Sequence, residues 1–334
     1  MDIQAYIVSI VAFLAILWLF NRSHNTPPGP LALPLVGNML SLSKDAYLDF
    51  DKMADRYGSV FQLKLGPTTA VILHGYDAVY QAFVRQGADF SDRPSVGVFE
   101  RLVRDPQYPD TGGKRERRKP GEGTEVFTEK FLWRGVLDIF QAGSETTSGA
   151  LCWAFLYMAV HTDVQEKVQK EIEDVIGSTR PATYSDKTSM PYTAATIKEI
   201  LRLANVTPYA VPRCTSADTT LYQYVIPKGT MIMASVWSVH HDKKYWQDVE
   251  TFLPERFLDE TGNIVHKDAY IPFSLGPRNC LGKQLVNVMM FLIFVNALQK
   301  YSLSLPENEP SPDLKGMSST TRVPMPYRLC ALKR

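Results

Sequence analysis

The chain has 334 residues, of which 45% are hydrophobic and 11% aromatic, and its formal net charge at pH 7 is +1. These values are ordinary for a globular protein and allow one large core or two modest ones. The near-zero net charge argues neither for nor against nucleic-acid binding. The sequence has no array of basic and aromatic residues that would stack on bases, so we expect no nucleic-acid partner. The four cysteines lack the spacing of metal-binding pairs, which indicates reduced thiols facing the cytosol.

Residues 3–20 are an apolar run interrupted only by Gln4, Tyr6 and Ser9. As a helix this run is about 27 Å long, which is just enough to cross a bilayer core. A cleaved signal peptide is the alternative, but no basic segment precedes the run and no small-x-small cleavage pattern follows it. We therefore predict a single-pass membrane anchor over residues 1–22, with the body of the protein in the cytosol.

Residues 23–30 include Pro27-Pro28-Gly29-Pro30. This composition predicts a stiff hinge that sets the body, residues 31–334, away from the membrane. The apolar pattern then predicts a helix, a two-stranded hairpin and a second helix, over residues 47–57, 60–65 with 69–73, and 76–85.

Residues 100–125 are charged and lack any apolar period, so we expect a disordered basic loop. A nuclear-localisation or nucleic-acid patch is the alternative. It fits less well, because acidic residues are interspersed and the chain carries a predicted anchor.

A long helix is predicted over residues 128–160, and its centre, Ala142-Gly-Ser-Glu-Thr-Thr147, is unusual. A glycine, an acid and two threonines interrupt the apolar face, which costs helix stability. A threonine hydroxyl can bond back to the carbonyl four residues earlier, bending the helix and opening space for a small ligand or water. The same residues could instead cap a helix or contact a neighbouring one.

A surface helix is predicted over residues 163–176 and is expected to be scaffold. A second helix over residues 192–203 and a strand-rich stretch over residues 206–233 follow it. The second helix carries Glu199 and Arg202 on one face, which alone indicates a surface pair worth a few tenths of a kcal/mol. His240 and His241 are adjacent and point apart, so a structural role is favoured over metal binding.

Residues 281–298 are apolar almost all round, which predicts a buried core helix rather than a second membrane span. The tail from residue 302 is expected to contain short strands that close the small sheet.

A glycine-rich loop, Phe273-Ser-Leu-Gly-Pro-Arg-Asn-Cys-Leu-Gly282, precedes this last helix. The positive end of a helix favours a thiolate at Cys280, and Arg278 adds a cation nearby. Gly276 and Gly282 leave room for a flat ligand over the loop. Taken alone, such a cysteine is more often a small core residue. A nucleophilic cysteine is another alternative, but no local signature or paired base supports it.

The pattern Phe-x-x-Gly-x-Arg-x-Cys-x-Gly resembles the haem-binding loop of the cytochrome P-450 family. The resemblance implies a mainly α fold with a small β-sheet region and haem b as the cofactor. It also implies that Cys280 is the axial thiolate on the haem iron, that Phe273 packs by the sulfur, and that Arg278 and Arg213 hold the haem propionates.

Other motifs resemble landmarks of the same family. Glu145 and Thr146 match the acid and alcohol pair that delivers protons during oxygen activation. Ala210 and Val211 match residues that line the substrate pocket. Glu199 and Arg202, read with Arg256 of Pro254-Glu-Arg-Phe257, match a buried network that locks a helix to the segment before the haem loop.

The resemblance covers residues 27–93 and then 131 to the C-terminus, without the long helical block that lies between these parts in full-length members. That block includes a Trp-x-x-x-Arg helix that braces a propionate. We therefore predict that apolar residues of the 131–160 helix are exposed.

The family resemblance implies a haem-dependent monooxygenase anchored in the endoplasmic reticulum membrane. It would take electrons from a flavoprotein reductase and insert one oxygen atom from O2 into a lipophilic substrate. Two alternatives remain open. One is an inactive truncated paralogue or splice product that acts as a membrane-bound interaction protein. The other is a haem-free enzyme that uses Cys280 as a nucleophile.

Overall fold

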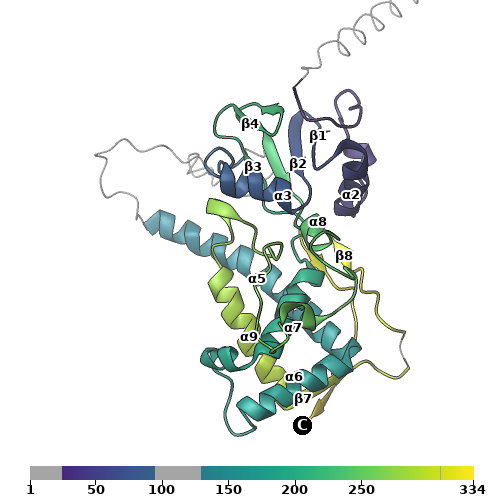
Figure 1. Ribbon diagram of the computed structural model, residues 1–334, viewed down its shortest axis with the longest axis vertical. Helices are drawn as coiled ribbons and strands as arrows, with labels where there is room; N and C mark the ends of the chain where they lie inside the picture. Colours follow the sequence, from purple (N-terminus) through teal and green to yellow (C-terminus); the bar gives the residue numbers. More distant parts are fainter. Residues whose placement is uncertain (1–24, 95–128, 309) are drawn as a thin grey trace, which may run out of the picture.

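The computed structural model describes residues 25–94, 129–308 and 310–334. The sheet lies at one end of the molecule and the long helices at the other, with α8 (Val236–His240) between them (Figure 1). The predicted anchor over residues 1–22 and the predicted loop over 100–125 lie outside the described residues. Within the part of the chain that is described, no helix is long and apolar enough to cross a membrane.

Four strands form the main sheet, in the order β1-β2-β6-β3. They are β1 (Val60–Leu65), β2 (Thr68–Leu73), β6 (Met231–Ala234) and β3 (Arg213–Cys214). β1 and β2 form an antiparallel hairpin, β6 joins β2 in parallel, and β3 pairs antiparallel with β6. The predicted hairpin is therefore confirmed, and it is extended by strands that lie far along the sequence.

Both faces of this sheet are covered. On one face Phe50 of α2 (Ala46–Tyr57) packs edge-on against Phe61, with ring centroids 6.1 Å apart. On the other face lie α3 (Tyr76–Tyr80) and η2 (Gln81–Arg85), the second of which is a π-helical segment rather than the α-helix expected over residues 76–85. The alternation of apolar and polar residues in β1 explains why one set of side chains is buried.

Four helices form the second core. They are α5 (Glu129–Val160), α6 (Thr162–Val175), α7 (Pro191–Ala204) and α9 (Lys283–Lys300). Buried side chains from all four meet around Trp153 and Phe294. Shorter segments connect and flank these helices: η1 (Met39–Ser41), η4 (Tyr184–Ser189), η5 (Pro254–Phe257) and η6 (Gly276–Arg278). The fold is mainly helical with small sheets, as the sequence predicts.

Two expectations about the C-terminal part are wrong. The tail does not close the main sheet but forms two separate two-stranded sheets, which pair β7 (Tyr301–Ser304) with β10 (Cys330–Lys333) and β8 (Met317–Ser318) with β9 (Arg322–Val323). Another two-stranded sheet pairs β4 (Thr219–Leu221) with β5 (Tyr224–Ile226). The sequence pattern shows where strands occur but not which strand each one pairs with.

Helix α9 is not buried all round, which corrects the second expectation. Phe291 and Phe294 are fully buried, whereas Leu285 is 54% exposed and Ile293 is 39% exposed. The helix contacts α5, α6 and α7 with one side only. An apolar sequence on every face cannot show which face has a neighbour.

The proline-rich hinge lies against the sheet instead of standing apart from it. Pro28 O accepts a hydrogen bond from Gln62 N of β1 at 2.8 Å. A Cβ at Gly29 would lie 2.1 Å from Gln62 O, so only glycine permits this close approach.

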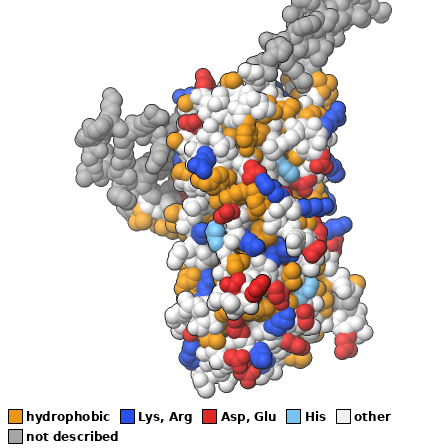
Figure 2. All heavy atoms as spheres, viewed as in Figure 1, with side chains coloured by type: hydrophobic (Ala, Val, Ile, Leu, Met, Phe, Trp, Pro, Cys, Tyr) orange, Lys and Arg blue, Asp and Glu red, His pale blue; other side chains and the backbone are white. Residues whose placement is uncertain are grey.

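The first half of α5 extends away from the helical core (Figure 1). Trp133 is 63% exposed and Phe140 is 74% exposed, whereas Trp153 in the second half is fully buried. Hydrophobic side chains gather on the surface at this end of α5 (Figure 2). The prediction of exposed apolar residues on this helix is confirmed.

Candidate functional site

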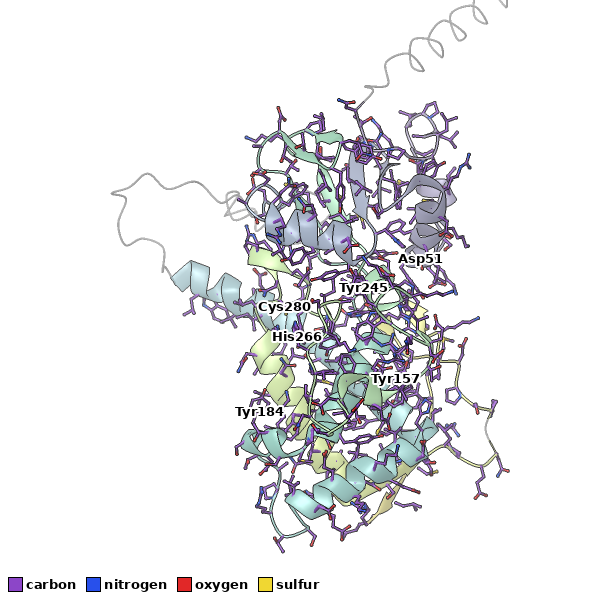
Figure 3. The ribbon with its side chains drawn as sticks, viewed as in Figure 1. Asp51, Tyr157, Tyr184, Tyr245, His266 and Cys280 are labelled. Carbon is purple, nitrogen blue, oxygen red and sulfur yellow. The ribbon has the colours of Figure 1, made fainter. Side chains whose placement is uncertain are left out.

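Cys280 lies in the loop between η6 and the start of α9, near the junction of the sheet and the helices (Figure 3). Its backbone N donates to Phe273 O at 2.9 Å, which closes the loop into a compact turn. The Cys280 side chain is exposed. The sulfur therefore lies at the surface, three residues before the first residue of α9, where a ligand can reach it.

The loop is docked on η2 of the sheet region. A Cβ at Gly276, which has φ +73°, would lie 1.8 Å from Phe83 O. A Cβ at Gly87 would lie 2.9 Å from Pro277 Cδ. Gly276 is therefore required for the contact between loop and η2, which differs from the expected role of leaving room for a ligand. At Gly282 a Cβ would have Cys280 Sγ as its nearest neighbour, at 3.9 Å.

Three arginines gather beside this loop. Arg213 is 1% exposed, and its Nη2 donates to Leu275 O at 2.7 Å and to Ser274 Oγ at 3.2 Å. Its guanidinium carbon lies 3.5 Å from the centre of the Phe83 ring. Arg278 Nε donates to Ser91 O at 2.8 Å, and Arg93 Nη1 donates to Pro212 O at 2.8 Å.

The arginine cluster has an excess of positive charge. Burial, together with the charges of Arg93 and Arg278, lowers the pKa of Arg213 to about 10. Burial, then Arg278, also lowers the pKa of Arg93. Among the described residues none of the three arginines forms an ion pair with a carboxylate, and Arg213 Nη1 is buried without a hydrogen-bond partner. A bound carboxylate would satisfy this atom and offset the repulsion.

Glu145 and Thr146 lie on α5, in a helix that is continuous through the unusual hexapeptide. Thr146 Oγ1 donates to Ala142 O at 2.7 Å, the bond to the carbonyl four residues earlier. Glu145 Oε1 accepts from Thr321 Oγ1 at 2.5 Å. Among the described residues, a Cβ at Gly143 would meet nothing within 4 Å.

Glu199, Arg202 and Arg256 meet in a buried network. Arg202 donates to both Glu199 carboxylate oxygens at 2.8 Å, and Arg256 Nε donates to Glu199 Oε1 at 2.9 Å. The first two side chains have no exposed surface. Arg202 Nη1 also donates to His240 O at 2.8 Å, so the network joins α7 to η5 and α8.

The structure adds a third arginine, Arg93, to the cluster, and no motif in the sequence assigned it there. Arg93 belongs to Phe90-Ser-Asp-Arg-Pro94, which precedes the undescribed residues, and only the fold brings it to Arg213 and Arg278. In the sequence, the only sign of this role is a single arginine in the segment from Phe90 to Pro94. Of the two expected pocket residues, Ala210 is buried and Val211 is 66% exposed.

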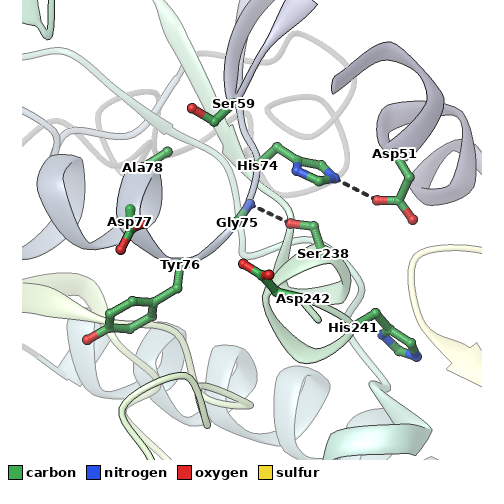
Figure 4. A pocket seen from close by; sticks show the side chains of 10 residues that line it. All are labelled: Asp51, Ser59, His74, Gly75, Tyr76, Asp77, Ala78, Ser238, His241 and Asp242. Atoms are coloured by element: carbon green, nitrogen blue, oxygen red, sulfur yellow. Dashed lines mark hydrogen bonds and ion pairs between the residues drawn. The ribbon is translucent and has the colours of Figure 1, made fainter. Parts of the chain in front are cut away.

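A separate cavity of about 330 Å³ lies between the sheet and α8 (Figure 4). His74 Nε2 and Asp51 Oδ1 lie 2.8 Å apart at its edge, and Gly75 N donates to Ser238 Oγ. None of the predicted haem-site residues lines this cavity. Within the described residues no group of three metal-ligating side chains occurs.

An exposed thiol in a loop that contacts Arg213, whose buried Nη1 lacks a partner among the described residues, fits haem, which offers a soft metal at its centre and two carboxylates at one edge. Comparison with known proteins agrees. A family model described as cytochrome P450 matches residues 27–108 and 113–331. The chain belongs to the cytochrome P450 family, whose cofactor is haem b.

Individual relatives match over different shares of the chain. Human cytochrome P450 2U1 is 43% identical over 219 residues, which cover 66% of this chain and 40% of that protein. Human cytochrome P450 2J2 is 42% identical over 66% of this chain and 43% of its own length. Mouse cytochrome P450 2D26 is 34% identical over 94% of this chain and 66% of its own length. The chain thus spans about 40% to 66% of the length of these relatives.

Proposed function

We propose that this chain is a haem-dependent monooxygenase that inserts one oxygen atom from O2 into a lipophilic organic substrate. The observation that carries the proposal is that one loop both carries the exposed Cys280 thiol and contacts Arg213, whose buried Nη1 lacks a partner among the described residues. In this proposal Cys280 ligates the haem iron, and Arg213, Arg278 and Arg93 hold the propionates. Bound haem supplies the redox chemistry of oxygen activation.

The remaining residues hold and move protons or support the site. Glu145 carries a carboxylate on α5, and the neighbouring Thr146 keeps its hydroxyl close to the helix by donating to Ala142 O. We assign proton delivery to this pair. The Glu199, Arg202 and Arg256 network fixes the segment before the loop. A flavoprotein reductase would supply electrons, and residues 1–22 would hold the protein in the endoplasmic reticulum membrane.

A second candidate is a non-catalytic form of the family that acts as a membrane-bound interaction protein. The exposed first half of α5 favours it, because the exposed side chains of Trp133 and Phe140 form an apolar surface of the kind that binds other molecules. In this case the chain can retain the arginine cluster and the thiol without turnover.

The first experiment is a carbon monoxide difference spectrum of the reduced, haem-loaded full chain. We expect a strongly red-shifted Soret band that is lost in Cys280→Ala and kept in Cys330→Ala, since Cys330 is an exposed cysteine on β10. Failure to take up haem, or a band that Cys280→Ala leaves unchanged, would contradict the assignment. Reductase-supported substrate turnover then separates the enzyme from the non-catalytic form.

A further inference from the structure

The side chain of Glu145 is held by a residue from the C-terminal part of the chain, Thr321. Thr321 Oγ1 donates to Glu145 Oε1 at 2.5 Å, at the short end of the range for a hydroxyl and a carboxylate. Glu145 lies on the exposed side of α5, whereas Thr321 is only 5% exposed. A buried hydroxyl therefore fixes a carboxylate that would otherwise move freely in solvent.

The hairpin that carries Thr321 is itself fixed on α5. Trp153 Nε1 of α5 donates to Arg322 O at 3.1 Å. Gly316, with φ +71°, brings the hairpin so close that a Cβ there would lie 2.6 Å from Trp153 Cζ2. On α5 itself, a Cβ at Gly149 would lie 3.3 Å from Val323 Cγ1. These contacts place β9 directly against the helix.

Arg322 anchors the same hairpin to α7. Its guanidinium is buried and donates to four backbone carbonyls, those of Leu203, Ala204, Leu314 and Lys315, at 2.5 to 2.9 Å. The first two belong to the last turn of α7, where carbonyls lack partners within the helix. Thr321, one residue earlier, consequently has little freedom to move.

We propose that Thr321 is a positioning residue that orients the Glu145 carboxylate for proton delivery. The inference rests on the proposed function, because Glu145 affects turnover only if the chain is a monooxygenase. Thr146 donates its hydroxyl proton to Ala142 O, so in this structure Thr321 rather than Thr146 holds Glu145. Without Thr321, a glutamate with three side-chain torsions samples many orientations.

The test is a double-mutant cycle between Thr321→Val, which keeps the shape but removes the hydroxyl, and Glu145→Ala. In urea unfolding of the full chain, we expect Thr321→Val to raise the unfolding equilibrium constant about tenfold, the effect of losing one hydrogen bond to a charged group. The double variant should show no further effect of the second change. Thr321→Ser should restore the coupling to Glu145. Ser318→Ala, which removes a hydroxyl of the same hairpin that has no partner among the described residues, should cause no loss of stability and no change in the coupling.

In the haem-loaded protein, Thr321→Val and Glu145→Ala should lower kcat by similar, non-additive factors without changing KM or the carbon monoxide spectrum. Independent effects in unfolding would overturn the contact. Coupling in unfolding with additive effects on kcat would overturn the positioning role. Coupling in unfolding without turnover in any variant would instead overturn the proposed function and the role in proton delivery, and would leave Thr321 as a structural clamp.

Discussion

His241 shows how burial alone can create a pH response. Its ring stacks on Trp237 with centroids 3.7 Å apart, and its Nδ1 donates to Trp237 O at 3.0 Å. Its Nε2 is buried without a partner in the described structure. Burial lowers the pKa of His241 from 6.5 to about 3. His241 therefore stays unprotonated in the folded protein at pH values where it binds a proton in the unfolded chain.

This difference predicts acid destabilisation with a defined sign. Because the unfolded state binds more protons between pH 6.5 and 3, the free energy of unfolding falls as the pH drops through that window. His241→Phe keeps an aromatic ring on Trp237 but cannot bind a proton. The slope of unfolding free energy against pH should decrease by up to about 1.4 kcal/mol per pH unit in urea titrations between pH 7 and 5. An unchanged slope would show that His241 does not contribute.

Arg213 gives a prediction about the carboxylates of haem. If its partnerless Nη1 binds a propionate, Arg213→Gln should weaken haem binding by about tenfold to a hundredfold, the range for a charge-assisted hydrogen bond. Haem dimethyl ester should bind the unmodified chain with a similar loss, and Arg213→Gln should cause little further loss for the ester. Titration followed by Soret absorbance measures these affinities.

Arg180→Gln is the matched control for this experiment, since Arg180 is an exposed arginine paired with Asp186. It should leave both affinities unchanged. Equal weakening of haem and its ester by Arg213→Gln would mean that Arg213 supports the loop through Leu275 O rather than contacting a carboxylate.

At the scale of single elements, η5 carries two neighbouring residues whose ion pairs differ in burial: Arg256 forms a buried pair and Glu255 an exposed one. Glu199 has no exposed surface and compensates Arg202 and Arg256. Glu255, next to Arg256, pairs with Lys167 at 2.8 Å but is 42% exposed. Removing a buried partner leaves charges uncompensated, whereas an exposed pair is solvated by water when it breaks.

Glu199→Gln should therefore lower the free energy of unfolding by about 3–5 kcal/mol. Glu255→Gln should lower it by less than about 1 kcal/mol. Urea unfolding with equal m-values measures both differences. Losses of the same size would mean that the Glu199 network adds little to the attachment of α7.

The family resemblance predicted both the residues of this network and its burial, whereas the helix spacing alone indicated a surface pair. A spacing of three residues on a helix is the same for a surface pair and a buried one, and only packing against η5 and α8 distinguishes them. The same limit applies to Gly276, because the carbonyl it accommodates belongs to Phe83, far away in the chain. Helix and strand positions follow local periodicity, and their predictions were largely confirmed. Thr321 and Arg93 carry no local signal that links them to Glu145 and Arg213.

At the scale of the whole molecule, the apolar end of α5 is the dominant exposed feature. Leu132, Trp133 and Phe140 are each more than 60% exposed, and they lie within nine residues of one helix. Apolar clusters of this kind promote association, because burying each large side chain contributes about 1.5–3 kcal/mol. The chain should therefore self-associate as its concentration rises and bind apolar fluorescent dyes.

Replacing two of these residues tests whether this surface drives association. Trp133→Ser combined with Phe140→Ser should weaken self-association by at least about tenfold, given the free energy of burying such side chains. Because both side chains are exposed, the urea midpoint should change little. Leu332→Ser, at an apolar residue of β10 that is 66% exposed, is the control and should leave association unchanged. Sedimentation velocity over a range of concentrations measures the association. If the double variant associates as strongly as the unmodified chain, another surface is responsible, and the exposed end of α5 does not explain the behaviour of the molecule.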